Sequence, residues 1–187
     1  MYMAKSLLAL IFVFTIYNTR LCFAKANSTW VKTEPYGHEQ KTTLQFYFHE
    51  TAHGKAQSLV KIAQRQETNL TSNPFGELYM ADNPITVSPD PNSLHVGQAQ
   101  GMYGVASKEE LSLIMALTYN FVEGVYNGSS ISLLCRNPIM ESIREFPVVG
   151  GTGLFRMARG YALAQTYLWN HDTGIVIVGY NVTVFHP

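Results

Sequence analysis

The feature that most constrains the fold of this chain is a series of short runs, rich in aromatic and β-branched residues, that are separated by turn signals. Asn83-Pro84, Asn127-Gly128 and the stretch 171–174 are such turn signals. The runs span residues 44–49, 58–63, 76–81, 95–105, 111–122, 130–134, 156–169 and 175–185. Helical periodicity is scarce, so the pattern predicts an all-β domain of about eight strands, built as a closed antiparallel barrel or a sandwich.

The run 111–122 is apolar on both of its faces. Its odd-numbered positions form one apolar face, while Ile114, Ala116 and Val122 lie on the other. A strand that is apolar on both faces is covered on both, and the polar stretch near the N-terminus has too few apolar residues to cover it. We therefore expect the outer face of the sheet to pack against another subunit in a homo-oligomer.

The N-terminal region carries the marks of export. Lys5 precedes an apolar run at residues 7–17, and small residues follow up to Ala26. This run is shorter than the ~20 residues that a membrane helix requires, and no later segment qualifies. We expect a secretory signal peptide at residues 1–26, a flexible arm at 27–41 and one domain at 42–187, in a protein that is secreted and soluble.

The net charge limits the classes of partner that the chain can bind, and the cysteine content limits the disulfides that it can form. The formal net charge is +0, and removal of the signal would make the chain slightly acidic, which argues against nucleic acid or an anionic membrane as a partner. Loss of Cys22 with the signal would leave Cys135 without an intramolecular disulfide partner, so we expect stability to come from the core. Sequons at Asn69, Asn127 and Asn181 are the expected glycosylation sites.

The stretch 144–160 combines three arginines with a glycine-rich segment, and we interpret it as the lip of a pocket. The glycines allow a sharp reversal, after which a strand from residue 156 onward would place Arg156 and Arg159 on opposite faces. Arg144 precedes the reversal. A phosphate-binding loop is disfavoured, because the spacing differs from a P-loop and no lysine follows the glycines.

His49, Glu50 and His53 match the H-E-x-x-H pattern of zinc hydrolases. That chemistry requires a helix to bring both histidines to one metal ion, whereas this motif closes a run with strand periodicity. In an extended chain the two histidines would lie ~13 Å apart. We therefore expect no metal site, and the zinc hydrolase remains only as an alternative.

Strand periodicity gives Glu50 a different role. Phe46, Phe48 and Glu50 share one face, so the carboxyl lies at the end of an aromatic wall. Desolvation there raises the pKa of a carboxyl unless an arginine holds it ionised, and either state is suited to proton transfer. The alternative is a solvated glutamate at a strand end.

Five segments together resemble the plant dirigent proteins. They are FYFHE at 46–50, VGQAQGMY at 96–103, YNGSSISLLCRNP at 126–138, REFPVVGGTGLFRMARGYA at 144–162 and YNVTVFHP at 180–187. The resemblance spans the mature domain and includes the branch with pterocarpan-synthase-like members. It implies an eight-stranded antiparallel β-barrel of the dirigent and allene-oxide-cyclase type, a trimer, secretion to the apoplast and a pocket for phenylpropanoid intermediates.

The resemblance also implies roles for individual residues. It assigns catalytic roles to Glu50, Tyr103, Arg144 and Arg159. The expected walls of the substrate pocket are Phe46, Phe48, Asn137 and Phe155. Three departures stand out: glutamate replaces the commoner aspartate at Glu50, Gln98 stands where many members have arginine, and Asn137 lies where one branch has a second aspartate. Because an amide cannot act as an acid, proton donation would then depend more heavily on Glu50.

Two functions follow from the resemblance. In the first, the protein guides phenoxy radicals or quinone methides that a separate laccase or peroxidase generates, as in lignan formation. In the second, it is an isoflavanol dehydratase in which Glu50 protonates the leaving hydroxyl and an internal phenol closes the ring. The sequence contains no recognisable haem, flavin, copper or nicotinamide motif, so we expect no cofactor, and oxidation would come from another protein.

Overall fold

The computed structural model describes residues 37–64 and 74–187, which belong to one folded unit that begins at Gly37. The expected signal peptide and Asn69 lie outside the described residues, as does most of the expected arm. The strands are β1 (Gln40–Thr51), β2 (Leu59–Ala63), β3 (Leu78–Thr86), β4 (His95–Val105), β5 (Ser112–Phe121), β6 (Ser130–Pro138), β7 (Arg144–Thr152), β8 (Arg159–Asn170) and β9 (Ile175–His186).

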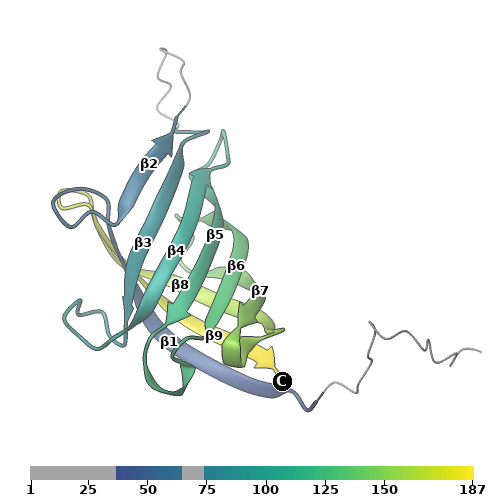
Figure 1. Ribbon diagram of the computed structural model, residues 1–187. Helices are drawn as coiled ribbons and strands as arrows, with labels where there is room; N and C mark the ends of the chain where they lie inside the picture. Colours follow the sequence, from purple (N-terminus) through teal and green to yellow (C-terminus); the bar gives the residue numbers. More distant parts are fainter. Residues whose placement is uncertain (1–36, 65–73) are drawn as a thin grey trace, which may run out of the picture. The chain divides into compact units, whose positions relative to one another are not determined.

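The strands form one antiparallel sheet in the order β1-β9-β8-β7-β6-β5-β4-β3-β2. A further pairing of β1 with β3, at Tyr47 with Thr86 and Phe48 with Ile85, closes the sheet on itself. The closed ring therefore contains eight strands, and β2 pairs with β3 outside it. Figure 1 shows β3 to β6 side by side as one wall of the barrel. The predicted eight-stranded antiparallel barrel is confirmed.

Side-chain alternation explains why these strands close around a core. In β5 and β7 nearly every second residue is buried, so one face of each strand points into the barrel. Three aromatic rings meet there, because Phe46 lies 5.5 Å from Tyr180 and 5.2 Å from Tyr119 between ring centroids. These rings fill the middle of the barrel.

The predicted runs account for eight of the nine strands in the described residues, and β7 is the one that was missed. Residues 144–152, which belong to the expected pocket lip, form β7. The run from residue 156 is not a strand at its start, because Met157 has a φ of 63° and β8 begins only at Arg159. The domain also begins earlier than residue 42, since Gln40 already pairs with His186.

The Gly-rich stretch closes one end of the barrel. Two short 3₁₀ turns, η2 (Gly124–Tyr126) and η3 (Gly153–Phe155), are the only helical segments within residues 37–64 and 74–187. The fully buried Phe155 ring stacks on Tyr126 with centroids 5.0 Å apart and contacts His186 edge-on. No helix in this part of the chain is long and apolar enough to cross a membrane.

Candidate functional site

A cavity of about 360 Å³ occupies the other end of the barrel. The ends of β1, β4, β6 and β8 and the starts of β3, β5, β7 and β9 supply its walls. The interpretation of residues 144–160 as a pocket lip is therefore correct only for Arg144. Phe155 does not line this cavity. It lies at the closed end of the barrel, where its ring stacks on Tyr126.

Glu50 and Tyr103 form a hydrogen-bonded pair in this cavity. Alternation along β1 turns Phe48 and Glu50 inward, as predicted, and the Tyr103 hydroxyl from β4 donates to Glu50 Oε2. Burial raises the pKa of the Glu50 carboxyl, and the hydrogen bond from Tyr103 offsets part of that shift. Burial and the nearby Glu50 also raise the pKa of Tyr103, so its hydroxyl stays protonated. The pair can hold a proton at the cavity wall.

Tyr79 extends this pair toward the start of β3. Its ring stacks on Tyr103 with centroids 5.9 Å apart, and its hydroxyl donates to Glu77. Lys61 on β2 forms an ion pair with the same carboxylate at 2.6 Å. The Glu77 carboxylate therefore fixes the orientation of a ring that lines the cavity beside the proposed acid.

Arg144 brings a cation into the same cavity. Its side chain is buried, and its Nη1 donates to the Ile139 carbonyl at 3.2 Å, while Nε has no hydrogen-bond partner in the part of the chain that the structure describes. Desolvation lowers the pKa of this guanidinium, and Tyr180 partly opposes that shift. An unpaired donor in a cavity wall is costly unless a ligand satisfies it.

Asn137 supplies an unpaired acceptor. Its Nδ2 lies 2.9 Å from Met115 Sδ, whereas its Oδ1 has no hydrogen-bond partner. Because a hydroxyl both donates and accepts, it could satisfy either Asn137 Oδ1 or Arg144 Nε. The polar part of the cavity therefore suits a neutral molecule with hydroxyl groups.

Arg159, in contrast, does not face the cavity. It is exposed and forms an ion pair with Glu39 at 2.7 Å, with its guanidinium 5.3 Å from the centre of the Phe185 ring. The reason is register, because the even-numbered residues of β8 from Ala162 to Thr166 face inward and Arg159 faces out. The predicted convergence of two arginines with Glu50 is wrong in this respect.

Phe46 is not a wall of the cavity. It lies in the core, and its ring stacks on the ring of Tyr180, which lines the cavity. Phe46 therefore contacts a wall residue of the cavity from the core side. Of the four expected wall residues, Phe48 and Asn137 line the cavity.

Of the two histidines of the H-E-x-x-H pattern, His49 lies in strand β1 and His53 lies in the turn after it. Neither lies on a helix. His49 Nε2 hydrogen-bonds with Thr86 Oγ1 at 2.7 Å, and His53 Nε2 lies 3.3 Å from the Asp172 carbonyl. Each imidazole thus has its own partner, that of His49 at the end of β3 and that of His53 in the turn between β8 and β9. The geometry of a helical zinc site is not present.

Comparison with known proteins places the chain in a family. The model of the Dirigent-like protein family matches residues 41–185, which span β1 to β9. The chain is a member of the dirigent family. The cavity that Glu50, Tyr103 and Arg144 line is therefore the inner cavity of a dirigent barrel, and proteins of this family act on phenolic substrates.

Two curated relatives are similar over most of their length. The dirigent chain is 49% identical to Dirigent protein 23 of Arabidopsis thaliana over 83% of each chain. It is 46% identical to Pterocarpan synthase 1 of Glycyrrhiza echinata over 79% of each chain. The solved structure of a pterocarpan synthase dirigent protein matches with a TM-score of 0.75 and 42% identity, over 82% of this chain and 89% of that one.

Several cavity residues of the dirigent chain were not found from the sequence. Tyr79, Tyr180 and Trp169 all line the cavity. Tyr180 was within reach of sequence reasoning, since alternation along the last run places it on one face with Val178 and Val182. Trp169 was not, because the register shift between Thr166 and Leu168 breaks the alternation just before it.

Proposed function

We propose that the cavity binds a planar phenolic intermediate and controls the face on which it reacts, without an oxidative centre of its own. The observation that supports this most directly is the Glu50–Tyr103 pair in an aromatic-lined cavity that also contains the buried Arg144. Aromatic and aliphatic walls hold a flat ring in one orientation. Arg144 and Tyr103 would stabilise negative charge that develops on a phenol oxygen.

In phenol coupling, a separate one-electron oxidase such as a laccase or peroxidase removes one electron and one proton from each phenol. Two phenoxy radicals then form the new bond without a further oxidant. The barrel would contribute orientation alone. If the oxygen of one phenoxy radical accepts a hydrogen bond in the cavity, that radical would expose a single face to the other radical.

A second candidate is dehydration of an isoflavanol, and the raised pKa of Glu50 favours it. The protonated carboxyl donates its proton to the leaving hydroxyl, the C–O bond breaks and water departs. A phenol on the same molecule passes its proton to the Glu50 carboxylate, which restores the acid, and a neutral quinone methide forms. The second phenol oxygen attacks the exposed carbon, and its proton moves to the oxygen of the first phenol, so that the net loss is one water. Similarity to pterocarpan synthases is consistent with this reaction.

One experiment separates the two candidates. The purified protein is incubated with an isoflavanol without oxidant and, separately, with a monolignol and laccase, and the products are resolved on a chiral column. Turnover of the isoflavanol that Glu50→Gln lowers by about 10²–10⁴-fold would establish the dehydratase. An enantiomeric excess only with laccase would establish the guide. Racemic coupling together with an unreacted isoflavanol would contradict both.

The remaining features of the proposal concern the setting of the protein. We infer secretion to the apoplast through a signal peptide at residues 1–26, with N-glycans on Asn69, Asn127 and Asn181. Asn127 and Asn181 are both exposed, which an attached glycan requires.

We also infer a homotrimer. Exposed apolar side chains form a row across the outer face of four strands, because Met80 pairs with Met102, Met102 with Ala116 and Ala116 with Leu134. These exposed side chains, with Ile114, match the outer face that the sequence predicted to be covered.

A further inference from the structure

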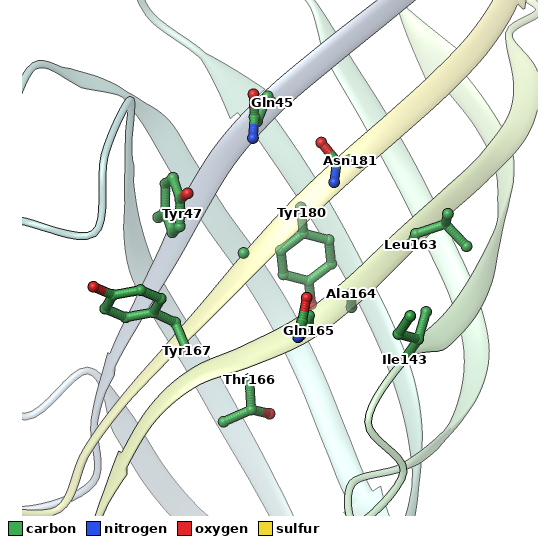
Figure 2. A pocket seen from close by; sticks show the side chains of 11 residues that line it. Gln45, Tyr47, Ile143, Leu163, Ala164, Gln165, Thr166, Tyr167, Tyr180 and Asn181 are labelled. Atoms are coloured by element: carbon green, nitrogen blue, oxygen red, sulfur yellow. The ribbon is translucent and has the colours of Figure 1, made fainter.

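A second hollow lies on the outer wall of the barrel and shares only Thr166 and Tyr180 with the lining of the cavity described above. It has a volume of about 450 Å³ and crosses β1, β9 and β8. Strand register places its side chains in two rows. Gly179 lies between Tyr47 and Gln165 in one row, and Asn181 lies between Gln45 and Leu163 in the other. Figure 2 shows this hollow, with Tyr47 and Tyr167 on one side and Leu163 and Ile143 on the opposite side. We call it the outer groove.

Gly179 creates the depth of the outer groove. It has no side chain, and a Cβ at this position would lie 3.2 Å from Cε1 of the Tyr47 ring. A larger residue would therefore fill the space between Tyr47 and Gln165. The hollow follows from one glycine in the centre of a three-stranded wall.

The polar groups of the outer groove are uncharged and available. Gln45, Gln165 and Asn181 each present an amide with both donors and an acceptor. Among the described residues, none of these three amides forms a side-chain hydrogen bond. Within residues 37–64 and 74–187, no lysine, arginine, aspartate, glutamate or histidine lines the groove. A ligand that matches this lining is neutral and has several adjacent hydroxyl groups.

Two tyrosine rings add an apolar surface to these amides. Tyr47 and Tyr167 meet edge-on at 81° with centroids 6.1 Å apart, and Tyr167 is 66% exposed. A face of the Tyr167 ring is thus open to a ligand. A pyranose ring has one apolar C–H face and a rim of hydroxyl groups, so it can stack on an aromatic ring while its rim bonds to amides.

We propose that the outer groove is a binding site for a neutral saccharide. Tyr167 stacks on one sugar ring, and the amides of Gln165, Gln45 and Asn181 bind its hydroxyl groups. The volume lies within the range typical of ligand sites. Through such a site, a protein that acts on phenols would bind to neutral polysaccharide. This binding would be independent of the reaction in its inner cavity.

Asn181 also begins a sequon, and a glycan attached to it would itself occupy the outer groove, so the site for a separate saccharide exists only in chains whose Asn181 is not glycosylated. The test therefore uses the full chain from a host that does not attach N-glycans. Linear hexasaccharides of glucose, xylose and mannose are titrated into the protein by calorimetry, and a hexagalacturonate serves as the charged control. We expect at least one neutral saccharide to bind with a Kd of about 1 mM or tighter, and the galacturonate not to bind.

Single substitutions test whether the saccharide binds in the outer groove. Tyr167→Ala and Gln165→Ala should each weaken the saccharide at least about tenfold, since both remove exposed contacts rather than core packing. Tyr161→Ala is the matched control, because Tyr161 is an exposed tyrosine on the same strand outside the groove. Equal binding by Tyr167→Ala and wild type would overturn the proposal, as would the absence of binding by all three neutral saccharides. Loss of the saccharide signal when a phenol fills the inner cavity would also overturn it.

Discussion

At the scale of single residues, burial in the inner cavity disfavours the charged forms of two groups that line it, the Glu50 carboxyl and the Arg144 guanidinium. Burial raises the pKa of Glu50 and lowers that of Arg144. No ion pair joins them among the described residues, and the nearest partner of Glu50 is the hydroxyl of Tyr103. A dry wall of this kind interacts strongly with charge that develops on a bound phenol, because few waters screen it.

Tyr103→Phe tests the role of Glu50 as an acid. The hydrogen bond from Tyr103 lowers the pKa of Glu50, while burial raises it, so removal of the hydroxyl leaves burial alone and raises this pKa further. An acid is active while it is protonated. The high-pH limb of the pH profile of kcat should therefore move to higher pH in the variant.

The measurement for Tyr103→Phe is kcat for isoflavanol dehydration over a pH series, with Tyr161→Phe on the outer wall as the control. A shift to lower pH in Tyr103→Phe, or an equal shift in both variants, would show that Glu50 is not the titrating acid.

The two arginines give a paired prediction. Arg144→Met should abolish selectivity for one product, because it removes the only guanidinium that lines the cavity among the described residues. Arg159→Met should leave the product ratio unchanged and cost at most about 1 kcal/mol of stability, since its ion pair with Glu39 is exposed. Chiral product analysis and thermal melts of both variants test this. Equal loss of selectivity in the two would show that Arg159 reaches the substrate.

At the scale of elements, alternation within a strand could be predicted from the sequence, but breaks in alternation could not. The period-two pattern of the first run placed Phe48 and Glu50 on the inner face. The same argument failed for Arg156 and Arg159, which were predicted to lie on opposite faces of one strand but are both exposed, because the η3 turn and the positive φ of Met157 precede β8. Neither feature has a sequence signal as strong as alternation.

Strand periodicity in the sequence was not enough to assign residues to the cavity. Arg144 lines the cavity because β7 begins there, yet residues 144–152 contain Pro147, Gly150 and Gly151 and were not among the runs predicted to be strands. Pairing with β6 and β8 overrides these weak strand formers. Resemblance to the family identified Arg144 as a site residue, while strand periodicity alone did not.

The glycines of β4 show how closely neighbouring strands approach. A Cβ at Gly97 would lie 2.1 Å from the Asn120 carbonyl oxygen on β5. We expect Gly97→Ala to lower the free energy of unfolding by about 1–3 kcal/mol, since backbone must move to accept the methyl group. Urea denaturation measures this, with the substitution Gly150→Ala as the control because a Cβ there meets nothing within 4 Å. Equal stability of Gly97→Ala and wild type would contradict the register of β4 against β5.

At the scale of the whole molecule, the barrel has a closed end, an open end and two different outer walls. Phe155 and its neighbours seal one end, and the cavity opens at the other. The wall of β3 to β6 carries the row of exposed apolar side chains, whereas the wall of β8, β9 and β1 carries the amides of the outer groove. This division would let the first wall pack in an oligomer while the second remains accessible.

Leu134→Glu tests the use of the apolar wall. Leu134 is 53% exposed and lies at the end of the row that begins at Met80, so a charge there should break the trimer without disturbing the core. Light scattering after gel filtration should report a trimer for wild type and a smaller species for the variant. Val125→Glu, at an exposed position outside that wall, should leave the trimer intact. A monomeric wild type would contradict the proposal.

The most direct test of the central claim is a crystal structure of the protein with an isoflavanol or monolignol bound. The account predicts electron density for the ligand in the cavity at the open end, with one of its oxygens within hydrogen-bonding distance of Glu50 or Tyr103 and another near Arg144. Density for the ligand only outside this cavity, or a ligand in the cavity with Glu50 and Arg144 both turned away from its oxygens, would contradict it.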